Sequence, residues 1–340
     1  MYRPIVMALL LLLTPALVSA QDQPAQKATK APAKADKKAK TPPQRPTPTV
    51  ADYAYGKDSD RQKFDFWQAR SDKPTPVVLL IHGGGWMNGD KSNYGTNAIK
   101  PYLDAGISVA AINYRFIPEA MKHNVEPPVK GPLHDAARAL QTIRSKAKEW
   151  NIDPNRVGAT GSSAGACTSL YLALADDLAD PNSDDPIARE SSRLTAAAVT
   201  GAQTSLDPKE LREWMPNAIY GGHAFGFQAP GRSRAEEFEL LIANREKVLP
   251  WIKQYSPIEL ISSDDPPLYL DYPNQKTPPV IGQAGPDPTH SALYGIKFAE
   301  AAKDSGIEVV VAYPGQADQK YGSVTKFLIE KLTAPAAAGK

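Results

Sequence analysis

Apolar residues along the chain fall into short continuous runs, and the segments between the runs carry apolar residues at helical spacing. The first run, Pro76–Ile81, contains no polar residue, which is typical of a strand buried on both faces of a sheet. Strands that alternate with helices indicate an α/β fold, in which helices cover both faces of a mostly parallel sheet. The expected strands are 76–81, 107–112, 156–160, 194–200, 268–270 and 309–312, and the expected helices are 97–104, 133–150, 164–178, 291–304 and 324–332.

One segment, residues 205–258, interrupts this alternation. It combines tryptophans, many charges and a glycine-rich piece, and its helical part is expected from Arg234 to Gln254. We interpret the segment as a cap inserted over the sheet, because such caps commonly shape a substrate pocket. A surface elaboration without a role in binding is the alternative.

The first 20 residues have the pattern of a secretory signal peptide. Arg3 provides the positive start, residues 5–13 form a short apolar core, and Val18-Ser19-Ala20 resembles a cleavage site. The apolar core is too short to span a bilayer comfortably. We therefore expect an exported protein, periplasmic or secreted, with an uncleaved N-terminal membrane anchor as the alternative.

Residues 21–49 are rich in Lys, Ala, Pro, Gln and Thr and contain almost nothing apolar to bury, which predicts a disordered linker. The linker carries seven basic and two acidic residues in a chain with a net charge of +2, so residues 50–340 are net acidic. The linker can make weak contact with an anionic surface, although a solvated spacer is the simpler interpretation. The domain at residues 50–340 has no basic character that would indicate nucleic-acid binding.

The most informative motif is Gly161-Ser162-Ser163-Ala164-Gly165, which reads G-x-S-x-G between a predicted strand and a predicted helix. A sharp strand-to-helix turn holds the serine in a strained, exposed conformation, which makes Ser163 a candidate nucleophile. The backbone N–H of the next residue, Ala164, is then a candidate donor to the oxyanion of a tetrahedral intermediate.

A second motif, His82-Gly83-Gly84-Gly85-Trp86, directly follows the first apolar run. Consecutive glycines let backbone N–H groups point at a ligand without interference from side chains. Together with the serine motif about eighty residues later, this loop predicts an oxyanion hole.

With these motifs the sequence resembles the α/β-hydrolase superfamily, in its esterase/lipase branch with an HGGG-type loop, and is similar to feruloyl-esterase-like and hormone-sensitive-lipase-like proteins. The resemblance implies that Ser163 is the nucleophile and that Gly83, Gly84 and Ala164 form the oxyanion hole. It also implies that Asp287 is the acid of the triad, while Asp271 is a poorer match. The matching stretches are His82–Trp86, Asn113–Arg115, Asp135–Ala139, Gly161–Gly165, Ser256–Ile258, Asp265–Pro267 and Tyr313–Gly315.

The chain departs from this family at the general base. Members carry a histidine on the loop after the last strand, where this chain has no histidine and Asp318 stands near the expected position. The chain has five histidines, and the order Ser…Asp…His survives only as Ser163, Asp287 and His290. The base matters because it contributes roughly 10²–10⁴-fold to catalysis by taking the proton of the serine.

Three hypotheses remain open. In the first, His290 reaches Ser163 and is oriented by Asp318 from the neighbouring loop, because triads are defined by geometry and not by chain position. In the second, the domain is a catalytically degenerate homologue that binds a ligand. In the third, His223 from the cap or His123 from a long loop reaches the serine.

The sequence therefore predicts an exported serine hydrolase of carboxylic esters that needs no cofactor. The expected partner is a small-molecule or carbohydrate-linked ester, and the sequence contains no indication of the oligomeric state. The single cysteine, Cys167, excludes an internal disulfide and is expected to be a small core residue, and no Cys or His cluster has the spacing of a metal site.

Overall fold

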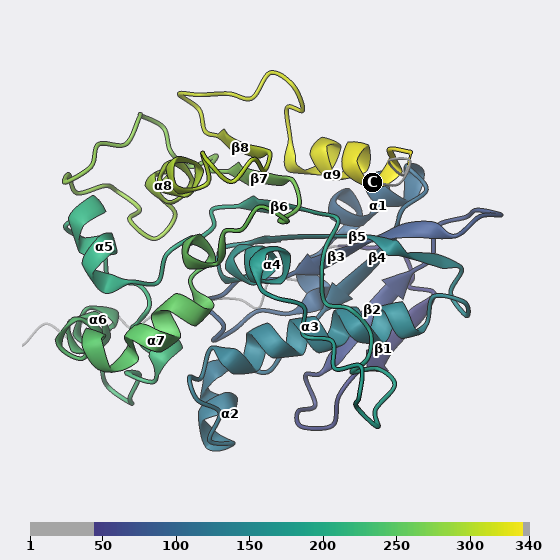
Figure 1. Ribbon diagram of the computed structural model, residues 1–340, viewed down its shortest axis with the longest axis horizontal. Helices are drawn as coiled ribbons and strands as arrows, with labels where there is room; N and C mark the ends of the chain where they lie inside the picture. Colours follow the sequence, from purple (N-terminus) through teal and green to yellow (C-terminus); the bar gives the residue numbers. More distant parts are fainter. Residues whose placement is uncertain (1–43, 336–340) are drawn as a thin grey trace, which may run out of the picture. The chain divides into compact units, whose positions relative to one another are not determined.

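The computed structural model describes residues 44–335, and within them eight strands form one sheet in the order β1-β2-β4-β3-β5-β6-β7-β8 (Figure 1). The neighbours from β4 through β8 pair in parallel, whereas β2 pairs antiparallel with both β1 and β4. The mostly parallel sheet predicted from the sequence is thus confirmed. The strands are β1 (Val50–Ala54), β2 (Lys63–Trp67), β3 (Thr75–Ile81), β4 (Ser108–Ile112), β5 (Ile152–Ser162), β6 (Ala196–Thr200), β7 (Leu268–Asp271) and β8 (Val309–Ala312).

Helices cover both faces of the sheet, as the alternating pattern indicated. The α1 and α9 helices pack on one face, and α3, α4 and α8 pack on the other (Figure 1). The sequence of strand β3 is apolar because both of its faces are buried: Val77 and Leu79 pack in the core on one side of the sheet, and Val78 packs on the other. The helices are α1 (Thr96–Asp104), α2 (Ile117–Lys122), α3 (Lys130–Ser145), α4 (Ala164–Leu174), α5 (Pro208–Trp214), α6 (Arg234–Ala243), α7 (Arg245–Tyr255), α8 (Leu293–Ala301) and α9 (Val324–Thr333).

Strand β2 was missed because two charged residues, Lys63 and Asp65, interrupt its apolar residues. Phe64 and Phe66 point into the core, and Asp65 between them is also buried. The Asp65 carboxylate accepts a hydrogen bond from Lys91 Nζ at 2.7 Å and another from Arg45 Nη1 at 2.6 Å. A buried charge is tolerated where it is paired in this way, so a strand can carry it.

The folded domain begins earlier than the predicted boundary at residue 50. Pro46 accepts a hydrogen bond from the indole of Trp67, and Gln44 accepts one from the backbone of Thr96. Residues 44–49 of the predicted linker are therefore attached to the domain. The predicted signal peptide (1–20) and the rest of the predicted linker (21–43) lie outside the described residues.

The predicted cap lies between β6 and β7, where residues 205–258 contain α5, α6, α7 and the 3₁₀ helix Gly222–Phe225, and a second 3₁₀ helix, Pro257–Leu260, begins at its end. The helix expected from Arg234 to Gln254 is split into α6 and α7 at Asn244. Helix α6 begins with a capping box in which Ser233 and Glu236 exchange side-chain-to-backbone hydrogen bonds. Phe238 and Leu241 of the cap belong to the same apolar core as α3 and α4, so the cap is packed onto the domain.

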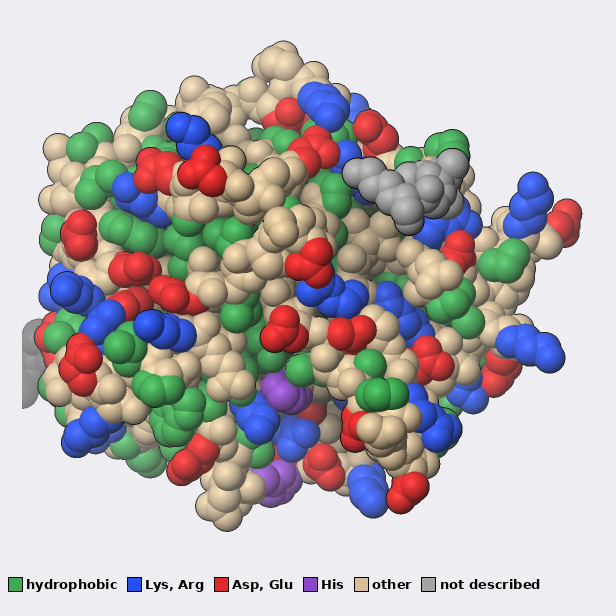
Figure 2. All heavy atoms as spheres, in the orientation of Figure 1, with side chains coloured by type: hydrophobic (Ala, Val, Ile, Leu, Met, Phe, Trp, Pro, Cys, Tyr) green, Lys and Arg blue, Asp and Glu red, His purple; other side chains and the backbone are tan. Residues whose placement is uncertain are grey.

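The surface of the domain carries mixed charge. On the face shown in Figure 2, Lys and Arg side chains are interspersed with Asp and Glu side chains. Within residues 44–335, none of the helices combines the length and the apolar character needed to cross a bilayer.

Candidate active site

The G-x-S-x-G motif forms the turn between β5 and α4. Ser163 has φ 54° and ψ −124°, a backbone conformation that residues with a side chain rarely adopt. Its backbone N–H donates a hydrogen bond to the carbonyl of Thr200 at the end of β6, at 3.0 Å. The strain at Ser163 is therefore held in place by the neighbouring strand, as expected for a nucleophile elbow.

Two glycines make this turn sterically feasible. A Cβ atom on Gly165 would lie 1.9 Å from the carbonyl oxygen of Ile81, and one on Gly161 would lie 2.4 Å from the same atom. Any side chain at either position would collide with the backbone of β3. The small residues of the motif thus allow the elbow to pack directly against the central strand.

The structure brings a histidine and a carboxylate to the serine hydroxyl. His290 Nε2 lies 3.0 Å from Ser163 Oγ, and His290 Nδ1 lies 2.8 Å from Asp287 Oδ2. Both side chains come from the segment between β7 and α8, residues 272–292, which we call the base loop. If Nδ1–H donates to the carboxylate, the Nε2 lone pair faces the serine hydroxyl and can accept its proton.

The glycine loop after β3 lies against the same serine. A Cβ atom on Gly83 would be 3.3 Å from Ser163 Cβ and 2.6 Å from the carbonyl oxygen of Ser162, so the loop approaches the elbow more closely than a side chain would permit. Gly84 has φ +107°, which favours glycine. Ala164 is the first residue of α4, where a backbone N–H has no acceptor within its own helix. Of the predicted oxyanion residues, Gly83 and Ala164 therefore lie beside the nucleophile, and Gly84 follows Gly83 in the same loop.

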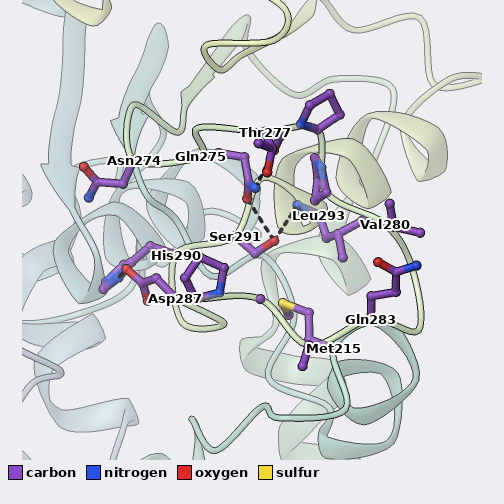
Figure 3. Close-up of a pocket in the computed structure, with 15 residues that line it drawn as sticks. Met215, Asn274, Gln275, Thr277, Val280, Gln283, Asp287, His290, Ser291 and Leu293 are labelled. Atoms are coloured by element: carbon purple, nitrogen blue, oxygen red, sulfur yellow. Dashed lines mark hydrogen bonds and ion pairs between the residues drawn. The ribbon is translucent and has the colours of Figure 1, made fainter.

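A cavity of about 170 Å³ opens beside the reacting side chains. It is lined by Ser162, Ser163, Thr200, Gly201, Tyr272, Pro273, Asn274 and His290. A second cavity, of about 120 Å³, lies within the base loop (Figure 3), with His290 and Asp287 at one end and Met215 of the cap among its walls. His290 and Asn274 line both cavities, so the two spaces meet at the base.

Comparison with known proteins identifies the family. Residues 65–275 match the model of the family described as BD-FAE. The chain belongs to the BD-FAE family. The match includes the glycine loop and Ser163, and it ends before Asp287 and His290.

Curated relatives of this BD-FAE family member include several esterases. Carboxylesterase NlhH of Mycobacterium tuberculosis is 33% identical over 107 residues, which are 31% of each chain. Esterase LipC of the same organism is 25% identical over 224 residues, or 64% of this chain and 48% of LipC. Gut esterase 1 of Caenorhabditis elegans is 32% identical over 141 residues, or 41% of this chain and 25% of the relative. The matched regions thus span less than half of these relatives.

Solved structures confirm the predicted α/β-hydrolase fold of this BD-FAE family member. A truncated carbohydrate esterase from gut microbiota superimposes with a TM-score of 0.62 at 18% identity, covering 86% of this chain and 100% of that one. An acetyl ester-xyloside bifunctional hydrolase from Caldicellulosiruptor lactoaceticus gives a TM-score of 0.55 at 22% identity, covering 79% of this chain and 86% of that one.

The geometry corrects one sequence-based expectation for this BD-FAE family member, namely that Asp318 orients His290. The Asp318 carboxylate accepts hydrogen bonds from the backbone N–H groups of Lys320, Tyr321 and Gly322, at 3.0, 2.7 and 2.6 Å. These bonds stabilise the turn after β8 and turn the carboxylate toward its own loop. Asp287, which the family resemblance favoured as the acid, is the carboxylate that contacts His290.

The two alternative histidines lie elsewhere. His223 is fully buried in the cap, where its ring packs edge-on against Tyr220 at 4.9 Å. Burial, with a further contribution from Arg234, lowers the pKa of His223 to about 3, so the ring is neutral. His123 is exposed at the end of α2. Among the described residues, His290 is the histidine that hydrogen-bonds to Ser163.

His82, the first residue of the glycine loop, is packed in a way that indicates a structural role. Its ring stacks on Tyr114 with centroids 4.3 Å apart, and Nδ1 lies 2.9 Å from the carbonyl oxygen of Gly83. Burial lowers its pKa to about 4, so the ring is neutral over the physiological range. The position of His82 thus supports the loop without contact to the serine hydroxyl.

Several residues near the serine carried no motif and were missed from the sequence. They are contributed by the ends of β6 and β7: Thr200, Gly201, Gln203, Tyr272 and Asn274. Their position after parallel strands is the only signal that could have indicated them, because ligands in α/β sheets bind at the carboxyl ends of strands. Within the part of the chain that the structure describes, no group of His, Cys, Asp and Glu side chains is arranged to hold a metal ion.

Proposed function

We propose that this protein hydrolyses carboxylic esters through an acyl-enzyme on Ser163, with His290 as general base and Asp287 as the residue that orients it. The observation that carries the proposal is the continuous chain of contacts from Ser163 Oγ through the His290 ring to Asp287, at 3.0 and 2.8 Å. Both distances lie within the range for proton transfer between a nucleophile and its base.

The reaction follows from these positions. Ser163 Oγ attacks the ester carbonyl while His290 Nε2 takes its proton, and the backbone N–H groups of Gly83, Gly84 and Ala164 stabilise the resulting oxyanion. His290 then gives the proton to the leaving alkoxide, and the C–O bond to the alcohol breaks. Water, activated by the same imidazole, hydrolyses the acyl-enzyme and restores the serine.

The alternative hypothesis of a non-catalytic binding module rested on the missing loop histidine. That argument loses its basis when another histidine occupies hydrogen-bonding distance from the nucleophile. The esterases among the relatives favour turnover as well.

The decisive experiment compares single variants on a chromogenic short-chain ester. We expect Ser163→Ala and His290→Ala each to lower kcat by about 10³-fold or more, because each removes a member of the proton-transfer chain. His123→Ala is the matched control, since His123 is exposed at the end of α2, and its kcat should stay within about twofold of wild type. Ester hydrolysis that survives His290→Ala, or that is absent from the wild type, would overturn the proposal.

We further propose that the ester is a small molecule or is linked to a carbohydrate. The cavity beside Ser163 measures about 170 Å³, which suits a small acyl or alcohol group. One protein with the same fold is named a carbohydrate esterase and another an acetyl ester-xyloside bifunctional hydrolase, which supports the second option. Rates on acylated oligosaccharides and on simple alkyl esters of the same acyl group would distinguish the two, and equal kcat/KM values would contradict a carbohydrate preference.

We also propose that the protein is exported, on the basis of residues 1–20 and their signal-peptide pattern. Expression of the full chain in a bacterial host, followed by cell fractionation and N-terminal sequencing, tests this. A mature protein that begins after Ala20 in the periplasm or medium is expected. Full-length protein in the membrane fraction would instead favour the N-terminal anchor, and full-length protein in the cytoplasm would contradict export.

A further inference from the structure

The end of β6 contacts both the nucleophile and the base. Thr200 accepts the backbone hydrogen bond of Ser163, as described above, and the next residue, Gly201, packs against the imidazole. A Cβ atom on Gly201 would be 3.3 Å from His290 Cδ2 and 3.5 Å from its Cβ, and Gly201 has φ +60°. Residues 200 and 201 therefore contact both the nucleophile and the base.

Gln203, two residues further, connects this strand end to the base loop. The side chain is fully buried, and its Nε2 donates to the carbonyl oxygen of Thr289 at 2.6 Å and to that of Gly201 at 3.1 Å. Thr289 is the residue immediately before His290. The Gln203 amide thus links the backbone next to His290 to Gly201, the residue against which the His290 ring packs.

The orientation of this amide is fixed by its surroundings. Both contacts of Nε2 are carbonyl oxygens, so a flipped amide would place its own oxygen against two acceptors. In the observed orientation Gln203 Oε1 is buried without a hydrogen-bond partner among the described residues. Leaving Oε1 buried without a partner is unfavourable, so the favourable contribution of Gln203 comes from the two hydrogen bonds that its Nε2 donates.

The acid and the base share one loop, which determines what a loop displacement would do. Asp287 and His290 are three residues apart and would move together, so their 2.8 Å contact would survive while the 3.0 Å contact to Ser163 would open. We propose that Gln203 is a positioning residue that sets the distance between His290 and Ser163 by holding the base loop to the end of β6. This inference rests on the proposed ester hydrolysis.

The test replaces the glutamine by an apolar residue of similar shape, Gln203→Met. Gln141→Met is the matched control, because Gln141 of α3 is also buried and its Nε2 donates to the carbonyl oxygen of Glu190 at 2.8 Å, away from the reacting groups. Both variants lose hydrogen bonds from one buried amide and should show a lower Tm. We expect kcat to fall about 10–100-fold in Gln203→Met, with KM changed by less than about threefold, and to stay within about twofold of wild type in Gln141→Met.

A second readout separates positioning from general damage. The proton between His290 Nδ1 and Asp287 should give a downfield ¹H NMR signal that persists in Gln203→Met, while the rate at which a phosphonate ester modifies Ser163 falls by the same factor as kcat. If Gln203→Met does not fold, Gln203→Asn keeps the amide but withdraws it by one methylene, and the same losses are expected.

The inference is overturned if kcat is unchanged, if Gln141→Met loses as much activity, or if the downfield signal disappears together with activity. A wild-type protein without ester turnover overturns the proposed function instead, and the phosphonate rates then still test the placement of the base.

Discussion

Replacing Asp287 by asparagine tests which carboxylate orients the base. The substitution is isosteric, but it replaces the carboxylate that contacts His290 Nδ1 at 2.8 Å, which can only accept hydrogen bonds, by a neutral amide that can present either its oxygen or its NH₂ to the ring. If the amide NH₂ faces Nδ1, the ring carries its proton on Nε2, where it points at Ser163 Oγ and can no longer accept the serine proton. The variant therefore keeps its shape, loses the negative charge that stabilises the imidazolium, and with the NH₂ facing Nδ1 also loses the productive tautomer.

The expected fall in kcat for Asp287→Asn depends on how exposed the Asp287 and His290 side chains are. The same substitution in a buried serine-protease triad lowers kcat about 10⁴-fold. Here the Asp287 side chain is 45% exposed and the His290 side chain 31%, so water can partly stabilise the imidazolium that forms. We expect a loss of about 10³-fold in kcat, which corresponds to roughly 4 kcal/mol of transition-state stabilisation.

The assay is steady-state hydrolysis of a chromogenic ester, with the acyl-enzyme burst measured in parallel. Asp318→Asn is the matched control, because Asp318 accepts backbone hydrogen bonds in its own turn, and its kcat should stay within about twofold of wild type. The assignment of Asp287 as the acid would be refuted if Asp287→Asn kept more than about a tenth of the wild-type kcat. It would also be refuted if Asp318→Asn lowered kcat as much as Asp287→Asn does.

Three further predictions concern stability. Gly165→Ala should prevent stable folding, seen as loss of soluble protein or a large fall in Tm, because its Cβ would lie 1.9 Å from the carbonyl oxygen of Ile81. For Glu308, burial raises the pKa, but the hydrogen bonds from Lys331, Tyr321 and Lys320 together outweigh burial and lower the pKa to about 2. Glu308→Gln should therefore cost about 1 kcal/mol at pH 7, an effect present above pH 4.5 and lost as the pH falls toward 2 in urea titrations. His223 is buried and neutral, with a pKa of about 3 against an ordinary value of 6.5, so its contribution to stability is present above pH 6.5 and is lost as the pH falls. His223→Gln should therefore reduce the pH dependence of the unfolding free energy by about one proton between pH 6.5 and 4. An unchanged pH dependence would contradict the burial of a neutral ring.

The sequence was sufficient for the parts of the fold that depend on apolar periodicity alone. The run Pro76–Ile81 predicts a strand buried on both faces, and β3 is such a strand because successive residues contact different helix layers. The pattern fails where burial is achieved by pairing charges. Asp65 lies between Phe64 and Phe66 in β2, and its partner Lys91 lies 26 residues away, so no local signal indicates that the carboxylate is buried.

The candidate site shows the same division between local and long-range information. Ser163 and the glycine loop lie in motifs of consecutive residues, so they could be named from the sequence. The orientation of His290 could not, because it depends on the conformation of the base loop. An extended chain would separate residues three positions apart by about 10 Å, whereas the turn in which His290 N–H donates to the carbonyl of Asp287 at 3.3 Å brings their side chains into contact. Because Asp287 and His290 lie on one turn, their contact depends on local conformation. The distance from His290 to Ser163 depends instead on how the rest of the fold holds the base loop. The contacts that the end of β6 makes with the base loop are therefore where we expect substitutions to change catalysis without touching the three reacting side chains.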